Sequence, residues 1–202
     1  MVRDLVPVHG GLDELVDRTV PLSERKAFSA EAAALPSVQV SRADLATLHR
    51  IGDGGLSPLE GPMRREVWER VLDERVIVSR GKRYAWTIPI ALPLSEAEER
   101  GLRPGGSVAV RDEAGVLVGV VDEAETYAFD RQRYVERVYG TKRLDHPGGR
   151  MVEAESRSRL LGGRLRVLAP PQHPEYGEYL LTPRMTRALI GYESSSCAAT
   201  GM

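Results

Sequence analysis

A polar loop in the last third of the chain carries the side chains best suited to binding an anion. Its candidate anion-binding or partner-binding residues are Thr141, Lys142, Arg143 and His146. Hydroxyl, ammonium, guanidinium and imidazole groups can hold a phosphate or sulfate through charge-assisted hydrogen bonds, or can face a partner domain. In the alternative interpretation, His146 hydrogen-bonds the backbone and only shapes the turn. The residues alone leave both interpretations open.

A second candidate lies in the Gly/Pro-rich stretch 51–63, where Ser57 and Glu60 are three residues apart. A serine and a carboxylate can act as nucleophile and base, but no histidine stands beside them. We therefore expect both side chains to bond the loop backbone. Four glycines and two prolines among thirteen residues exclude a regular helix or strand. No lysine follows these glycines, which argues against a phosphate-binding loop.

Carboxylates and ring side chains elsewhere in the chain are interpreted structurally. Asp122, Glu123 and Glu125 could attract a metal, but carboxylates that follow a strand usually form a solvated edge. Trp68 and Trp86 are expected in the core or lining a barrel. We expect no metal site and no cofactor.

Composition favours a globular protein of the cytoplasm. The chain has 202 residues, 42% hydrophobic and 28% charged, with a single cysteine, Cys197. No apolar run approaches the ~20 residues of a membrane span. The net charge is -1, but residues 131–166 hold ten Lys/Arg against four Asp/Glu. This basic stretch is either a set of solvated faces or a surface for an anion or partner.

The elements that must position these residues alternate without a repeat. Helices are expected at 22–35, from the Ser41–Asp44 capping box to Ile51, and at 64–74, 95–101, 130–139 and 182–190. Strands are expected at 37–40, 76–79, 84–92 with an interruption at Pro89, 107–111, 116–121, within 151–161, and at 164–168. The strand 116–121 is apolar enough to be buried on both faces. Residues 140–150 are expected to be a loop. The pattern predicts an α+β fold with a small barrel-like sheet.

Five stretches, in the same order, resemble ATP sulfurylases (sulfate adenylyltransferases). They are Gly54 to Gly61, Trp86 to Ile90, the hairpin Leu102 to Val121, Tyr139-Gly140-Thr141 with His146-Pro147-Gly148, and Leu181 to Arg187. The motif residues given a structural role are Gly55, Ser57, Pro58, Glu60, Gly61, Trp86, Pro89, Pro147 and Gly148. The resemblance covers roughly residues 10 to 190.

The resemblance implies the PUA-like N-terminal domain of that family, a pseudo β-barrel with N-terminal and flanking helices. The domain is expected over residues 1–190, and the composition after Gly191 predicts a disordered tail, 191–202. The family's catalytic Gln-x-Arg-Asn-Pro and His-x-x-His motifs do not occur here. The expected partner is therefore a catalytic ATP-sulfurylase domain, another protein or a second copy of the chain, with no membrane.

Three functional hypotheses follow. The first is a scaffold or docking domain of sulfate activation that is not catalytic by itself. The second is a module that binds RNA or an anion through the basic stretch, although the 5% aromatic content makes nucleic acid a poor partner. The third is a free-standing enzyme of another reaction that uses Glu60, Arg143 and His146, which would require a concave pocket lined by these side chains.

Overall fold

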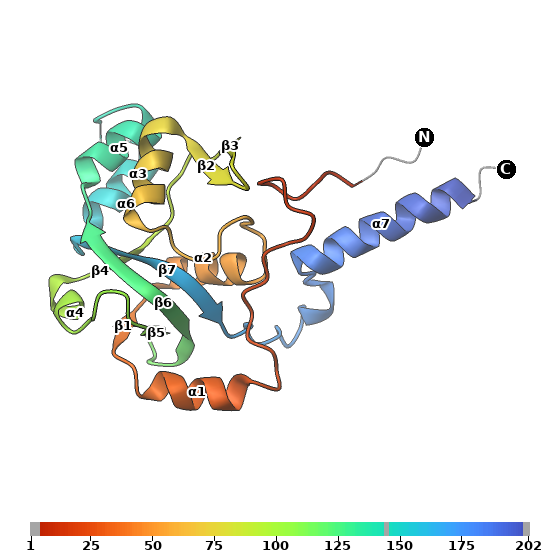
Figure 1. The fold of residues 1–202 in the computed structure, drawn as a ribbon, viewed down its shortest axis with the longest axis horizontal. Helices are drawn as coiled ribbons and strands as arrows, with labels where there is room; N and C mark the ends of the chain where they lie inside the picture. Colours follow the sequence, from red (N-terminus) through yellow and green to blue (C-terminus); the bar gives the residue numbers. More distant parts are fainter. Residues whose placement is uncertain (1–4, 144–145, 200–202) are drawn as a thin grey trace.

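A curled five-stranded sheet forms the centre of the molecule (Figure 1). The computed structural model describes residues 5–143 and 146–199, with residues 192–199 as backbone only. In sheet order the strands are β1 (Ser37–Gln39), β5 (Val108–Arg111), β6 (Leu117–Ala128), β7 (Arg159–Val167) and β4 (Leu92–Leu94). Only β1 and β5 pair in parallel; the other neighbours are antiparallel. The predicted α+β fold with a small barrel-like sheet is confirmed.

Helices surround this sheet and one hairpin stands apart from it. Those of the body are α1 (Arg25–Ala33), α2 (Arg42–Gly52), α3 (Arg65–Glu74), α4 (Glu96–Arg100), α5 (Arg131–Tyr139) and α6 (Pro147–Ala154). The hairpin joins β2 (Val76–Ser79) to β3 (Lys82–Ala85). In Figure 1, α3, α5 and α6 gather at one end of the sheet and α1 lies at the opposite end. The 3₁₀ turn η1 (Gly177–Tyr179) leads to α7 (Pro183–Ala199), which extends away from the body.

The beginnings of α2 and α4 are fixed by side chains that the sequence identifies. The Ser41 hydroxyl accepts a hydrogen bond from the Asp44 backbone N–H, and the Asp44 carboxylate accepts one from the Ser41 N–H. Ser95 and Glu98 repeat this capping box at α4. Each box satisfies backbone donors that the first helical turn cannot satisfy by itself. Both predicted helix starts are confirmed.

Residues 108–110 of β5 and 118–121 of β6 are buried on both faces, so the burial expected for the apolar run 116–121 is confirmed for 118–121, whereas Val116 is 60% exposed. Val108 pairs with Val121, and both belong to the main core cluster. Their neighbours Ala109 and Val120 also pair, but contribute to a smaller cluster with Phe28 of α1. The central strands therefore separate two cores, and α1 closes the smaller one.

The strand expected from Tyr84 to Leu92 is wrong in its middle part. β3 ends at Ala85 and pairs only with β2, whereas β4 begins at Leu92 and pairs with β7. The segment between them crosses from the hairpin to the main sheet. Proline cannot donate to a strand ladder, and Pro89 lies where the chain leaves regular pairing.

The strand expected within 151–161 is wrong in its first part, and the loop expected at 140–150 is wrong in its last part. Helix α6 occupies Pro147–Ala154, and β7 begins at Arg159. Gly148 and Gly149 conceal this helix because glycine is a poor helix former. Pro147 at the first helical position was the available signal for its start.

The last helix begins where it was expected, but it is longer. The Thr182 hydroxyl accepts a hydrogen bond from the Met185 backbone N–H at 3.2 Å, and Pro183 is the first residue of α7. The helix continues to Ala199 instead of ending at Ile190. The division into a domain over 1–190 and a disordered tail stays a prediction.

Candidate functional site

The Gly/Pro-rich loop is a hydrogen-bonded turn that holds the N-terminal segment. Ser57 is buried; its hydroxyl donates to the Gly54 carbonyl at 2.7 Å and accepts from the Val16 N–H at 2.9 Å. This is the backbone role expected for Ser57. Gly55 completes the turn by donating its N–H to the Asp53 carboxylate at 3.0 Å. A serine bonded in this way is a structural residue and not a nucleophile beside a base.

The same loop then runs along the outer edge of β7. The Gly163 N–H donates to the Pro62 carbonyl at 2.9 Å, and the Leu165 N–H donates to the Glu60 carbonyl at 2.8 Å. A Cβ atom at Gly61 would overlap the carbonyl oxygen of Gly163, so only glycine fits this crossing. The signature stretch therefore has a structural cause, which is the close approach of two backbones.

The expectation that Glu60 bonds the loop backbone is wrong for its side chain. The Glu60 carboxylate pairs with Arg164 on β7, with 3.0 Å between Oε2 and Nε. Arg164 also lies 3.9 Å from Glu123, which pairs in turn with Arg64. These side chains are exposed, so the ion pairs between the loop and the sheet contribute little to the free energy of folding.

Trp86 and Pro89 lie on the crossing segment and contribute to packing. The Trp86 ring packs against the main core, and its Nε1–H donates to the Ile88 carbonyl at 2.8 Å. The ring of His9 lies 5.8 Å from it, so Trp86 links the N-terminal segment to the body. Trp86 therefore packs against the core, which is one of the two roles expected for it.

His146 caps a helix and rests on an aromatic ring. Its Nδ1 accepts a hydrogen bond from the Gly148 N–H at 3.1 Å, so the neutral ring carries its proton on Nε2. The ring centroid lies 4.7 Å from that of Tyr139. A Cβ atom at Gly148 would overlap the Tyr139 hydroxyl, which explains glycine after Pro147.

Before His146 in this loop, Lys142 and Arg143 are exposed and Thr141 is half-buried. The Thr141 hydroxyl accepts from the Arg143 N–H at 3.1 Å, and Lys142 lies 3.6 Å from Glu136 on α5. The loop thus places an imidazole N–H and two cations at the surface. Whether an anion or a partner meets them stays a prediction.

The basic stretch 131–166 is largely neutralised by carboxylates from other parts of the chain. Among the described residues of this stretch, ion pairs are formed by Arg133, Arg137, Lys142, Arg157, Arg159, Arg164 and Arg166. Most of their partners precede residue 131. Much of the charge separation along the sequence is therefore compensated in space.

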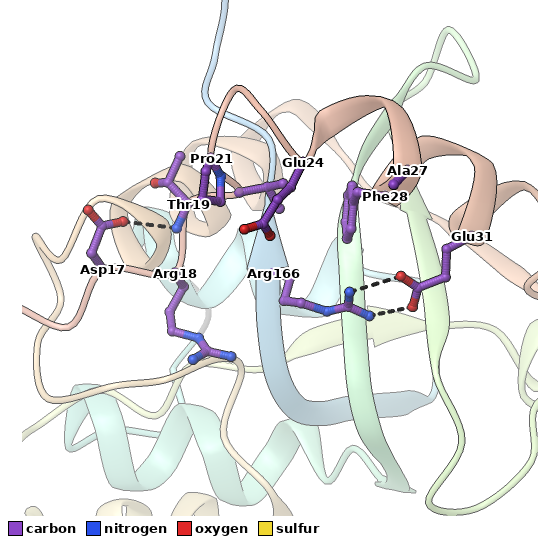
Figure 2. Close-up of a pocket in the computed structure, with 10 residues that line it drawn as sticks. Asp17, Arg18, Thr19, Pro21, Glu24, Ala27, Phe28, Glu31 and Arg166 are labelled. Atoms are coloured by element: carbon purple, nitrogen blue, oxygen red, sulfur yellow. Dashed lines mark hydrogen bonds and ion pairs between the residues drawn. The ribbon is translucent and has the colours of Figure 1, made fainter.

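Arg166 is one basic residue of this stretch whose charge is paired with carboxylates from distant parts of the chain, Glu31 among them (Figure 2). It lines a hollow of 370 Å³ next to α1 and bridges Glu31 at 2.7 Å and Asp122 at 2.7 Å. Its hydrogen bond lowers the pKa of Glu31. Burial alone would raise the pKa of Asp122, but hydrogen bonds from Arg166 and Ser107 outweigh it and lower that pKa. The bridge from Arg166 to Glu31 and Asp122 joins α1 to the sheet.

Two adjoining hollows of 320 and 500 Å³ lie beside the His146 loop, between α2, the crossing segment, α5 and α6. Tyr134 lines both, and burial raises its pKa to about 12. The ring of Trp68 stacks on it at 6.0 Å. At one end Arg157 is held by Glu155 at 2.5 Å. This groove is mainly apolar, and its charged groups are already paired.

The segment that follows the sheet exposes apolar side chains instead of burying them. We call residues 176–190 the arm; its exposed large apolar residues are Tyr176, Tyr179, Leu180, Leu181, Met185, Leu189 and Ile190. Sequence reasoning recognised the helix here but not this surface. Within the part of the chain that the structure describes, no helix is both long and apolar enough to span a bilayer. The described side chains also contain no group of three His, Cys, Asp or Glu arranged to hold a metal.

Comparisons with known proteins agree with this architecture. The model of a PUA-like domain family matches residues 6–170. A sulfate adenylyltransferase of Pyropia yezoensis is 38% identical over 200 residues, covering 96% of this chain and 46% of that protein. One of Symbiobacterium thermophilum is 37% identical over 188 residues, covering 93% of this chain and 46% of that protein. The chain thus spans about half the length of these relatives.

A solved structure shares the fold. It is described as a hexameric APS kinase from Thiobacillus denitrificans and matches with a TM-score of 0.65 at 26% identity. The match covers 92% of this chain and 31% of that one. Sheet topology, the structural role of the Gly/Pro-rich loop and the family match agree, and the chain therefore belongs to the PUA-like domain family.

Proposed function

We propose that this chain is a scaffold or docking domain of sulfate activation and that it does not catalyse adenylyl transfer by itself. The observation that carries the proposal is that the family model and the chain together account for less than half of each sulfate adenylyltransferase relative. The PUA-like family model ends at residue 170, whereas the sulfate adenylyltransferase relatives are about twice as long as this chain. More than half of each relative therefore has no counterpart among these residues.

The use of polar side chains supports the same proposal. Adenylyl transfer to sulfate needs dense positive charge on a phosphate and a cradle for the triphosphate. Here Ser57 bonds the backbone, Glu60 pairs with Arg164, and His146 caps α6. These residues serve three separate structural roles, which argues against an enzyme that uses Glu60, Arg143 and His146 together.

The test is a pyrophosphate-release assay with ATP and sulfate. The purified chain should give no turnover above the buffer blank, and the full-length Symbiobacterium relative provides the positive control. A thermal-shift panel with ATP, adenosine 5′-phosphosulfate and pyrophosphate should leave the melting temperature unchanged, since a ligand specific for the native state must raise it. Turnover by the chain alone, or a clear shift with a nucleotide, contradicts the proposal.

An anion-binding role for the loop that holds Thr141, Lys142, Arg143 and His146 is the second candidate. It is favoured by the hydrogen bond from Gly148 to Nδ1 of His146, which leaves Nε2–H as the donor of an exposed side chain, and by the exposed side chains of Lys142 and Arg143. Sulfate would then raise the melting temperature of the wild type, and His146→Ala would remove that rise. An equal rise in both proteins would indicate a general salt effect. RNA is a weaker candidate because most of the basic stretch is paired.

A further inference from the structure

The two adjoining hollows beside the His146 loop form one groove, which we call the Tyr134 groove. Their volumes are 320 and 500 Å³, and four residues line both of them: Asp44, Pro89, Ala91 and Tyr134. Hollows of this size are typical of the pockets in which proteins bind small molecules. A molecule that lies across both hollows contacts Tyr134.

Exposed apolar side chains line each hollow. Ile88, which is 51% exposed, lines the larger hollow, and Met151, which is 70% exposed, lines the smaller one. Exposed apolar residues that are scattered singly are ordinary on a protein surface. When they lie around a hollow they indicate a binding site.

Aromatic rings form one wall of the smaller hollow, which Trp68, Phe129, Tyr134 and Tyr139 all line. The ring of Trp68 stacks on Tyr134 with 6.0 Å between the centroids. Phe129 and Tyr139 meet the Tyr134 ring edge to face, at 5.7 and 6.4 Å. A flat ligand ring can extend this cluster by contacts of the same kind, and the thioether of Met151 adds a polarisable contact.

The charged side chains that line the groove already have partners of opposite charge. Arg157 lies 2.5 Å from Glu155 and 3.4 Å from Asp44, and Arg50 pairs with Asp53. A charged ligand would lose its hydration here without meeting an unpaired opposite charge among the described lining residues. The groove therefore favours a neutral ligand, which separates it from any site for a nucleotide or sulfate.

Tyr134 supplies the polar contact of the groove. Of the four residues that line both hollows, it alone has a hydrogen-bond donor in its side chain. Burial raises the pKa of Tyr134 to about 12, so the hydroxyl keeps its proton at neutral pH. This hydroxyl forms no hydrogen bond with any residue that the structure describes. Phenylalanine would give the same ring packing, so the hydroxyl is available to a ligand with an acceptor.

We propose that the Tyr134 groove binds a neutral aromatic compound that carries a hydrogen-bond acceptor. The ring of the compound packs against the aromatic wall, and its acceptor receives a hydrogen bond from the Tyr134 hydroxyl. This site goes beyond the scaffold or docking role, and it can be tested on the chain alone.

NMR titration with quinoline tests the proposal. At neutral pH quinoline is an uncharged fused ring with one acceptor nitrogen and no donor, and naphthalene has the same shape without the acceptor. The chain is labelled at its methionine methyl groups. Met151 reports on the groove, and Met185, which is exposed on the arm, is the internal control. The Met151→Leu variant assigns the first resonance.

The Met151 resonance should shift saturably, with a dissociation constant of about 1 mM for a ligand of this size, while Met185 stays unchanged. Tyr134→Phe should weaken quinoline binding about fivefold, as expected for the loss of one hydrogen bond, and should leave the naphthalene shift unchanged. Tyr179→Phe is the matched control, because it removes an exposed hydroxyl from the arm, and it should bind like the wild type.

A filled groove gives the second variant. Ala91→Leu places a larger side chain where both hollows meet, and it should abolish the Met151 shift while the circular dichroism spectrum stays that of the wild type. No shift of Met151 in the wild type at about 10 mM quinoline overturns the proposal. Equal, unsaturable shifts of Met151 and Met185 indicate general association with the surface and also overturn it. Equal affinities of Tyr134→Phe and the wild type overturn the requirement for an acceptor.

Discussion

The body and the arm treat the same kinds of side chain in opposite ways. In the body, Leu161 is fully buried and the carboxylate of Asp122 is bonded by Arg166 and Ser107. On the arm, Leu189 leaves half of its surface in water, with 50% exposed. In the body, apolar side chains such as Leu161 are buried and Asp122 has partners from other parts of the chain. On the arm, apolar side chains such as Leu189 remain exposed among the described residues. The difference separates residues that maintain the fold from residues whose apolar side chains stay exposed in the part of the chain that the structure describes.

The largest expected loss of stability comes from truncating one buried leucine of the body. Leu161→Ala should lower the free energy of unfolding by about 2–5 kcal/mol, because it leaves a cavity at a site with no exposed surface. Urea unfolding followed by circular dichroism measures this loss. A loss under ~1 kcal/mol would show that the sheet is not the rigid part of the molecule.

The Gly/Pro-rich loop offers the next largest effect. Gly61→Ala should cost about 3 kcal/mol, at the upper end of overpacking, because the obstacle is the backbone of Gly163. Gly101→Ala is the control, since a Cβ there meets its nearest atom at an ordinary 3.4 Å. Thermal unfolding of both variants provides the comparison. Equal melting temperatures would mean that the loop does not hold the edge of β7.

Removing the bridge between α1 and the sheet should have a smaller effect. Arg166→Met should cost about 1–2 kcal/mol at neutral pH, because it leaves Asp122 partly buried with only Ser107 as partner. The folded-state pKa values of Asp122 and Glu31 are lowered, so this stability is present above their unfolded values near ~4. It is lost as the pH falls through the folded values.

Urea unfolding of Arg166→Met and the wild type between pH 7 and pH 3 measures this dependence. The gap between the two proteins should narrow toward the acid end. A gap that widens on acidification would exclude the bridge as its source.

The smallest effect belongs to the arm. Leu189→Ser should change the free energy of unfolding of the isolated chain by less than ~0.5 kcal/mol, as is usual for exposed positions. The same urea experiment measures it. A loss comparable to that of Leu161→Ala would show that the arm is part of the folded core, and would remove the contrast between the two regions.

The sequence predicts features that depend on nearby residues and misses those that depend on distant ones. The capping boxes at Ser41 and Ser95 are local, and both helices begin where they were expected. Helix α6 was missed because Gly148 and Gly149 lower helix propensity, although Pro147 and the ring of His146 start it. The anion-binding or partner-binding role of Thr141, Lys142, Arg143 and His146 stays a prediction.

Long-range pairing accounts for the rest. The basic stretch looked like a surface, yet Arg166 finds Glu31 and Arg133 finds Asp73, far away along the chain. No local pattern encodes these pairs. The apolar residues of the arm also gave a helix signal without saying whether the helix would be covered, because burial depends on what else packs nearby.

The covered edge of β7 has a consequence for how this protein is made. That edge is bonded by β4, by Glu60 and Pro62 of the loop, and by Arg18 and Val20 of the N-terminal segment. All three segments are synthesised long before β7 leaves the ribosome. These three segments cannot make their contacts with β7 until β7 has been synthesised, since contacts between distant segments form late. The core around β7 can therefore form only after β7 itself has been synthesised.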